Sequence, residues 1–121
     1  KRIFEMTAAL KTALPDAREM GRHADSAADL LKALANPRRL QILCVLGEGE
    51  LSVSALNERI PLSQSALSQH LAVLRSDGLV RTRRESQVIH YSVCPGPALD
   101  IIHVLHGHFC RATRPKKRSH S

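Results

Sequence analysis

The stretch LSQSALSQHLAVLRSDGLVRTRRESQVIHYSV, residues 62–93, decides the fold because a short amphipathic helix runs directly into a basic hairpin. Ser63 is suited to cap the start of a helix over 64–77, and the dipeptide Asp77-Gly78 is suited to end it. One face of this helix is apolar and repeats at helical spacing, with Leu67, Leu71 and Leu74. The opposite face carries small or amide side chains, which are Gln64, Ser65, Ser68, Gln69 and Ala72.

Two short strands are predicted after this helix, over 79–83 and 88–92, with residues 84–87 as the hairpin tip. Another short helix, over about 52–60, precedes the helix at 64–77 and is separated from it by only about four residues. Two helices joined so closely form a helix-turn-helix, and the hairpin that follows them is then a wing.

The rest of the chain supplies three more predicted helices, over about 16–35, 37–47 and 97–112. Asn36 followed by Pro37 is typical of an N-cap and a first helical residue. The predicted fold is mainly α with a small β-hairpin. It is a winged helix-turn-helix with the order helix, helix, helix, helix, strand, strand, helix.

The formal charge of +7 on 121 residues is concentrated toward the ends of the chain. Residues 111–121 hold five basic residues and no acidic one, whereas residues 15–110 are neutral overall. Within that neutral part, a local basic cluster adjoins the predicted helix and hairpin, with Arg75, Arg81, Arg83 and Arg84. Such a cluster is a better indicator of nucleic-acid binding than the net charge.

Composition argues against several other classes of protein. An apolar run of about 18 residues, as a membrane span needs, is missing, and so is a signal peptide, so a cytoplasmic, reducing setting is expected. Three cysteines are too few for a disulfide scaffold, and two Phe, one Tyr and no Trp disfavour a module that stacks single-stranded bases. Nucleophile elbows, phosphate loops and paired carboxylates are absent from the sequence, so neither an enzyme nor a cofactor is expected.

The helix-turn-helix and the wing together predict binding to double-stranded DNA. In the major groove, polar side chains of the helix would reach base edges, namely Gln64, Ser65, Ser68 and Gln69. At the wing, Arg83, Arg84 and Gln87 would straddle phosphates or enter the minor groove. A polar-faced helix or a basic hairpin alone is more often a plain surface element. The adjacency of the two in this order is what favours DNA binding. One half-site would bind weakly, so a homodimer formed through the terminal helices is expected.

The segment LLKALANPRRLQILCVL (30–46), the segment 62–93 and the last helix resemble the ArsR/SmtB family of winged-helix repressors, over about residues 24–112. SALSQHLAVLRSDGLV (65–80) is the most specific part. The resemblance implies a homodimer that binds operator DNA until an inducer releases it. The predicted organisation is an N-terminal extension over 1–15, a DNA-binding and dimerisation domain over 16–112, and a basic flexible tail over 113–121.

The resemblance also bears on the inducer. Many relatives bind thiophilic metals through a Cys-Val-Cys motif, where this chain has Ser52, Val53 and Ser54, and hydroxyls are poor ligands for such ions. A metal-responsive repressor stays the alternative, because three potential ligands share one stripe of the last helix, namely His103, His106 and Cys110.

Read by themselves, the cysteines predict little: Cys44 suits a small buried side chain, and Cys94 a structural or incidental role. The resemblance adds a pairing, because ILC in the second helix and FC near the end of the last are similar to the BigR/HlyU-type branch, which responds to persulfides and polysulfides. It implies that reactive sulfur species cross-link Cys44 and Cys110 and that the cross-linked form loses operator affinity.

Overall fold

The computed structural model describes residues 16–120, and their side chains over 16–110. The described part of the chain divides into two units between Leu31 and Lys32. The predicted domain bounds stay a prediction. The first unit holds most of α3 (Ala17–Leu34). The predicted N-terminal extension, 1–15, lies outside the described residues. Across 16–120, no helix combines the length and the apolar character that a membrane crossing needs.

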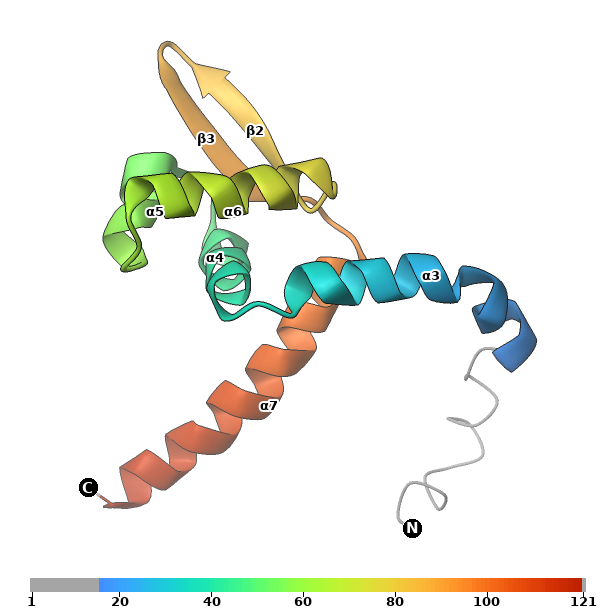
Figure 1. The fold of residues 1–121 in the computed structure, drawn as a ribbon. Coiled ribbons are helices and arrows are strands. Elements are labelled where there is room, and N and C mark those ends of the chain that lie inside the picture. The colour runs from blue at the N-terminus through green and yellow to red at the C-terminus, as the bar shows by residue number, and fades with distance from the viewer. Residues whose placement is uncertain (1–15, 121) are drawn as a thin grey trace. The chain divides into compact units, whose positions relative to one another are not determined.

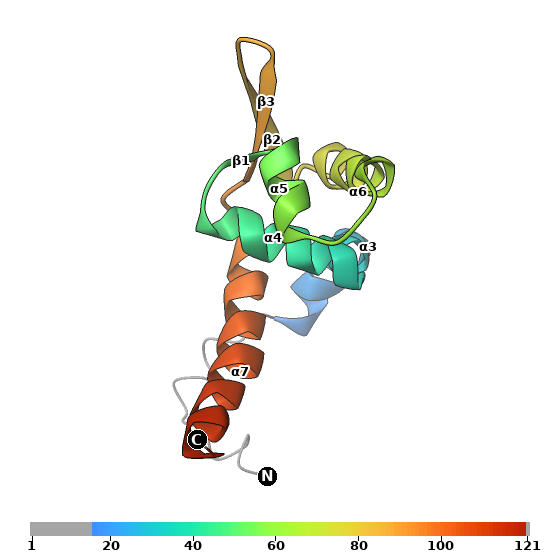
Figure 2. The same cartoon turned by 90° about the vertical axis from the view of Figure 1, so that its left-hand side faces the viewer.

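The second unit confirms the predicted winged helix-turn-helix (Figure 1). Its elements are α4 (Pro37–Glu48), β1 (Leu51–Ser52), α5 (Val53–Arg59), α6 (Gln64–Ser76), β2 (Val80–Glu85), β3 (Val88–Val93) and α7 (Pro97–His120). Helix α4 lies between the hairpin on one side and α7 on the other (Figures 1 and 2). Helix α7 was predicted to end near residue 112, and its backbone is instead helical through His120.

Polar caps set the boundaries of α4 and α6. The Asn36 side chain accepts hydrogen bonds from the backbone N–H of Arg38 and Arg39, at 3.0 and 3.1 Å. Helix α4 ends at Glu48 and not at Gly47 as predicted, and it is Gly49 that follows it as the C-cap. At α6, the hydroxyl of Ser63 accepts from the N–H of Ala66 at 3.1 Å, as its N-cap position requires.

A left-handed glycine turns the chain from α6 into the wing. Gly78 adopts φ 75°, a conformation that favours glycine because it has no Cβ. The N–H groups of Gly78 and Leu79 bond back to the carbonyl oxygens of Arg75 and Leu74, at 3.0 and 2.9 Å. The prediction that Asp77-Gly78 ends this helix is therefore confirmed.

The sheet has three antiparallel strands in the order β1-β3-β2. Strand β1 was not predicted, because two residues are too short to show an alternating pattern; it pairs Leu51 with Tyr91 and Ser52 with His90. The predicted tip at 84–87 was wrong, since Arg84 and Glu85 pair with Ile89 and Val88 and so belong to the ladder. The turn consists of residues 86–87 alone.

The core of the second unit is aliphatic and lies where α4, α5 and α6 meet. The predicted stripe of α6 is confirmed as buried, at 1% exposure or less for all three leucines. The fully buried side chains are Ile42, Leu43, Leu56, Ile60, Leu67, Leu71 and Leu74. With one face of α6 fixed in this core, its opposite face is left toward solvent.

Candidate DNA-binding surface and thiol pair

The polar face of α6 is exposed, as the sequence predicted. All five of its residues are solvent-exposed, namely Gln64, Ser65, Ser68, Gln69 and Ala72. His70 is half-buried, so it sits at the border of this face. The leucines of α6 are buried in the core, and its opposite face exposes amides and hydroxyls to solvent. Side chains of these types can hydrogen-bond to base edges in the major groove.

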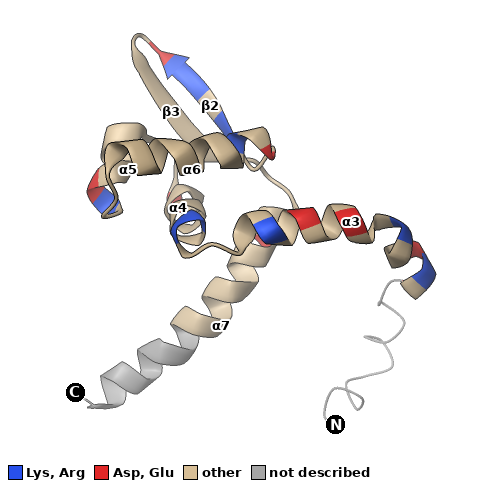
Figure 3. Ribbon diagram, in the orientation of Figure 1, with Lys and Arg blue, Asp and Glu red and all other residues tan. Residues whose placement is uncertain are grey.

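The wing carries its arginines on β2, and Figure 3 shows this strand largely in blue with a red tip, beside a β3 that has no Lys, Arg, Asp or Glu. Successive residues of a strand point to opposite faces, so Arg83 and Arg84 lie on different faces of the hairpin. Arg84 donates from Nε to the carbonyl oxygen of Ser86 at 3.2 Å. Gln87, in the turn, is exposed.

Arg83 is engaged by carboxylates, which the sequence did not indicate. Its guanidinium pairs with Glu50 at 2.8 Å and with Glu85 at 3.4 Å, and His90 Nε2 lies 3.6 Å from Glu85 Oε1. The hydrogen bond from Arg83 lowers the pKa of Glu50 below its usual range. Glu50 lies 33 residues from Arg83 in the chain, and only the unpredicted strand β1 brings it to the base of the wing.

A second ion pair forms at the C-terminal end of α4. Glu48, the last residue of α4, accepts a hydrogen bond from Arg59 of α5 at 3.0 Å. Glu48 and Glu50, which Gly49 separates, therefore pair with different elements: Glu48 with α5 and Glu50 with β2. Sequence reasoning missed both pairs, because neither has a local spacing rule.

The predicted sensing cysteines lie on α4 and α7, which pack together. Cys44 is half-buried and Cys110 is exposed, and both are free thiols. Burial is the main cause that raises the pKa of Cys44, followed by the charge of Cys110 and then that of Glu48.

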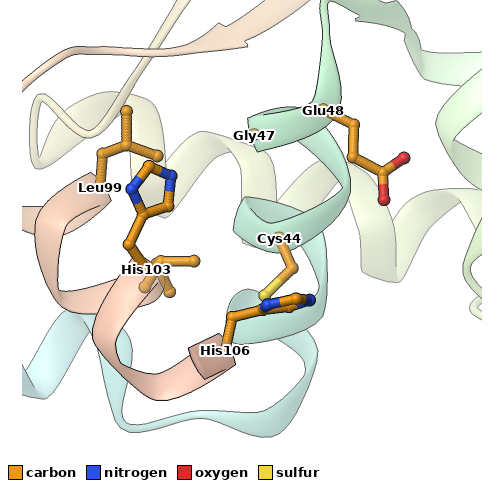
Figure 4. Close-up of a pocket in the computed structure, with 7 residues that line it drawn as sticks. Cys44, Gly47, Glu48, Leu99, His103 and His106 are labelled. Atoms are coloured by element: carbon orange, nitrogen blue, oxygen red, sulfur yellow. The ribbon is translucent and has the colours of Figure 1, made fainter. Parts of the chain in front are cut away.

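A pocket of about 240 Å³ opens between α4 and α7 beside Cys44. Its lining residues are Cys44, Gly47, Glu48, Leu99, Ile102, His103 and His106. Figure 4 shows the Cys44 side chain directed from α4 toward the turn of α7 that bears His106. The pocket gives a small solute access to the Cys44 thiol.

The alternative metal set is not assembled. Within the described part of the chain, no three His, Cys, Asp or Glu side chains converge as metal ligands would. His103 and His106 line the pocket instead, and Cys110 is exposed. Cys94 is half-buried just after β3, and its N–H donates to the carbonyl oxygen of Leu79 at 2.9 Å.

Comparison with known proteins decides the family. Residues 36–82 match the model of the bacterial regulatory proteins of the arsR family. The transcriptional activator HlyU of Vibrio cholerae serotype O1 is 50% identical over 105 residues, which is 87% of this chain and 97% of that protein. The chain belongs to the arsR family.

Solved structures place this arsR-family chain in a branch with HlyU and BigR. The regulator HlyU from Vibrio vulnificus has a TM-score of 0.72 at 50% identity, covering 78% of this chain and 98% of that one. The transcriptional repressor BigR from Xylella fastidiosa has a TM-score of 0.71 at 39% identity, covering 80% and 96%. The protein is thus a transcriptional regulator with an arsR-type helix-turn-helix, and its relatives belong to a class without enzymatic activity, as predicted.

Proposed function

We propose that this regulator is a homodimeric repressor that binds operator DNA and releases it when reactive sulfur species cross-link Cys44 and Cys110. The observation that carries the proposal is the packing of α4 against α7, which directs the Cys44 side chain toward the turn of α7 that bears His106, four residues before Cys110. It supports a pair of thiols close enough to share a bridge. The similarity to BigR, which is named a transcriptional repressor, supports repression, whereas HlyU of Vibrio cholerae is named a transcriptional activator.

DNA binding is assigned to α6 and the wing. The exposed face of α6 enters the major groove, where its amides and hydroxyls contact base edges, through Gln64, Ser65, Ser68 and Gln69. Arg84 and Gln87 approach the backbone or minor groove from the wing. Large apolar side chains left exposed on α7 support the homodimer: Val104 is 69% and Phe109 63% exposed.

The burial of the two thiols suggests the order of the chemistry. The exposed Cys110 meets a polysulfide first: its thiolate attacks a sulfur of HSSH, HS⁻ leaves, and Cys110 becomes a persulfide. The Cys44 thiolate then attacks Sγ of Cys110 and expels a second HS⁻. In sum, two thiols and one HSSH give one disulfide and two H₂S, so HSSH is reduced and the thiols are oxidised.

A longer bridge forms if both cysteines become persulfides before they react. The two persulfides then condense to a trisulfide with loss of one H₂S. A disulfide needs Cα atoms within about 7 Å, whereas each added sulfur widens the span that can be closed. Either bridge ties α4 to α7 and thereby biases the position of the helix-turn-helix that packs on α4.

The test compares four full-length chains, namely wild type, Cys44→Ser, Cys110→Ser and the matched control Cys94→Ser. Each is titrated with a labelled duplex obtained by in vitro selection on the reduced wild-type chain, before and after treatment with inorganic polysulfide. We expect wild type and Cys94→Ser to lose affinity at least tenfold, and both other variants to keep it. Normal release by Cys44→Ser or Cys110→Ser would rule out the switch.

Two further measurements separate the parts of the proposal. Intact mass after treatment should show a bridge in wild type that reductant removes and that neither single variant forms. In vitro transcription from a promoter carrying the selected duplex should fall when the reduced chain is added. A rise in transcript would make the protein an activator instead of a repressor.

A further inference from the structure

A forked ion pair ties the wing to the segment that follows α4. Arg83 donates from Nε to both carboxylate oxygens of Glu50, at 3.2 and 3.1 Å, and from Nη2 to Oε1 at 2.8 Å. Its Nη1 lies 3.4 Å from Glu85. The planar, directional donors of this guanidinium are therefore already committed to carboxylates of the same chain.

We propose that Arg83 and Glu50 position the wing for DNA binding, and that Arg84 is the arginine beside them that neutralises a DNA phosphate. This role rests on the proposed operator binding but not on the sulfur switch. It reassigns Arg83, which the sequence grouped with Arg84 and Gln87 as a DNA contact.

The first argument is the balance of charge on the two faces of the hairpin. Arg83 shares its face with Arg81, Glu85 and the cross-strand neighbour His90, and Glu50 lies against Arg83. A phosphate that approached Arg83 would therefore meet two carboxylates. Arg84 points to the other face, where its Nε is bonded to a neutral carbonyl oxygen, so its positive charge stays uncompensated by that contact.

The second argument is mechanical. Strand β1 pairs only with His90 and Tyr91, so the hairpin beyond that point has just two strands. Two-stranded ribbons twist more than wider sheets and are weakly stable alone. Glu50 precedes β1 and reaches Arg83 of β2, so the pair spans the three-stranded base diagonally. A bidentate contact between a guanidinium and a carboxylate fixes the relative orientation of the two side chains as well as the distance between them.

The test uses the full-length reduced chain and two labelled duplexes, one obtained by in vitro selection and one of random sequence and equal length. Affinity is measured over a range of salt, because each lost phosphate contact lowers the slope of log K against log salt by about one. For Arg83→Gln we expect binding to the selected duplex about two- to fivefold weaker, with the slope unchanged. For the matched variant Arg84→Gln we expect the slope to fall by about one.

Glu50→Gln and Arg83→Lys complete the test. Under the positioning role, Glu50→Gln weakens binding as Arg83→Gln does, and the double variant is no worse than either single one. Arg83→Lys keeps the charge but loses the fork, so it resembles Arg83→Gln. Glu50, Arg83 and Arg84 are all surface residues, and equal urea midpoints would verify that each variant folds.

Three results would overturn the assignment. The first is a slope of log K against log salt that is reduced by about one in Arg83→Gln. The second is tighter DNA binding by Glu50→Gln. The third is wild-type affinity either in both Arg83→Gln and Glu50→Gln or in Arg83→Lys. If the wild-type chain selects no duplex, the operator proposal fails and takes the positioning role with it. A changed slope in Arg83→Gln would leave operator binding intact and refute only the positioning role.

Discussion

Removing the Ser63 hydroxyl is expected to loosen the first turn of α6 and to reduce operator specificity more than general DNA affinity. Ser63 Oγ accepts the N–H of Ala66 at 3.1 Å, and that donor has no partner within the helix this close to its start. The backbone bond from Leu67 N–H to the Ser63 carbonyl oxygen, 3.0 Å long, survives the substitution. The loss therefore falls on the turn that carries Gln64 and Ser65.

The size of the effect follows from the single bond that is lost. Replacing an N-cap serine by alanine costs about 1 kcal/mol. For a domain of this size, such a change lowers Tm by roughly 4–8 °C. Since 1.4 kcal/mol is about tenfold in an equilibrium constant, opening of the first turn becomes about fivefold more frequent.

Three assays check this prediction. Thermal unfolding gives the change in Tm, amide exchange of Ala66 reports the first turn, and titrations with selected and random duplexes compare specific with general affinity. Ser76→Ala, at the exposed opposite end of α6, is the matched control. Ser63→Asn keeps a capping acceptor and should restore Tm. The reasoning is refuted if Ser63→Ala behaves as Ser76→Ala, or if both duplexes lose affinity equally.

Two other predictions concern the core and the Cys44 thiol. Leu71→Ala should reduce the free energy of unfolding by about 2–5 kcal/mol, because Leu71 is 1% exposed; a urea titration showing a loss below about 1 kcal/mol would contradict the packing. Glu48→Gln, made in a Cys94→Ser/Cys110→Ser background, should speed alkylation of Cys44 and move its pH–rate midpoint downward. The reason is that the negative charge of Glu48 raises the pKa of Cys44, so less thiolate is present at a given pH. The shift should be partial, since burial is the larger cause, and an unchanged or higher midpoint would contradict the assignment.

Much of the fold was predictable because its determinants are local. The caps at Asn36 and Ser63 and the stripe of Leu67, Leu71 and Leu74 act within one or two helical turns, and the structure confirms them. The turn at Gly78 depends on one residue. The exposed face of α6 follows from burial of the other face. These parts of the candidate DNA surface could therefore be identified from residue patterns alone.

What the sequence missed depends on contacts between distant segments. Strand β1 has two residues and exists only because β3 pairs with it. The ion pairs of Glu48 and Glu50 depend on where α5 and β2 are placed, and no spacing rule relates them to Arg59 or Arg83. The hairpin tip was misplaced because charged residues were read as a loop, whereas Arg84 and Glu85 extend the ladder.

The order β1-β3-β2 makes β2 an edge of the sheet, with its outer N–H and C=O groups open along a strand of six residues. Open edges invite pairing with the edge of another molecule, and charged side chains discourage it. Arg81, Arg83, Arg84 and Glu85 thus also keep two wings from joining into a continuous sheet. A variant that replaced them with valine or isoleucine would remove the proposed phosphate contact of Arg84 together with this protection against self-association. Aggregation of such a variant would then look like a DNA-binding defect. Neutralising the wing with glutamine keeps the edge polar and separates the two effects.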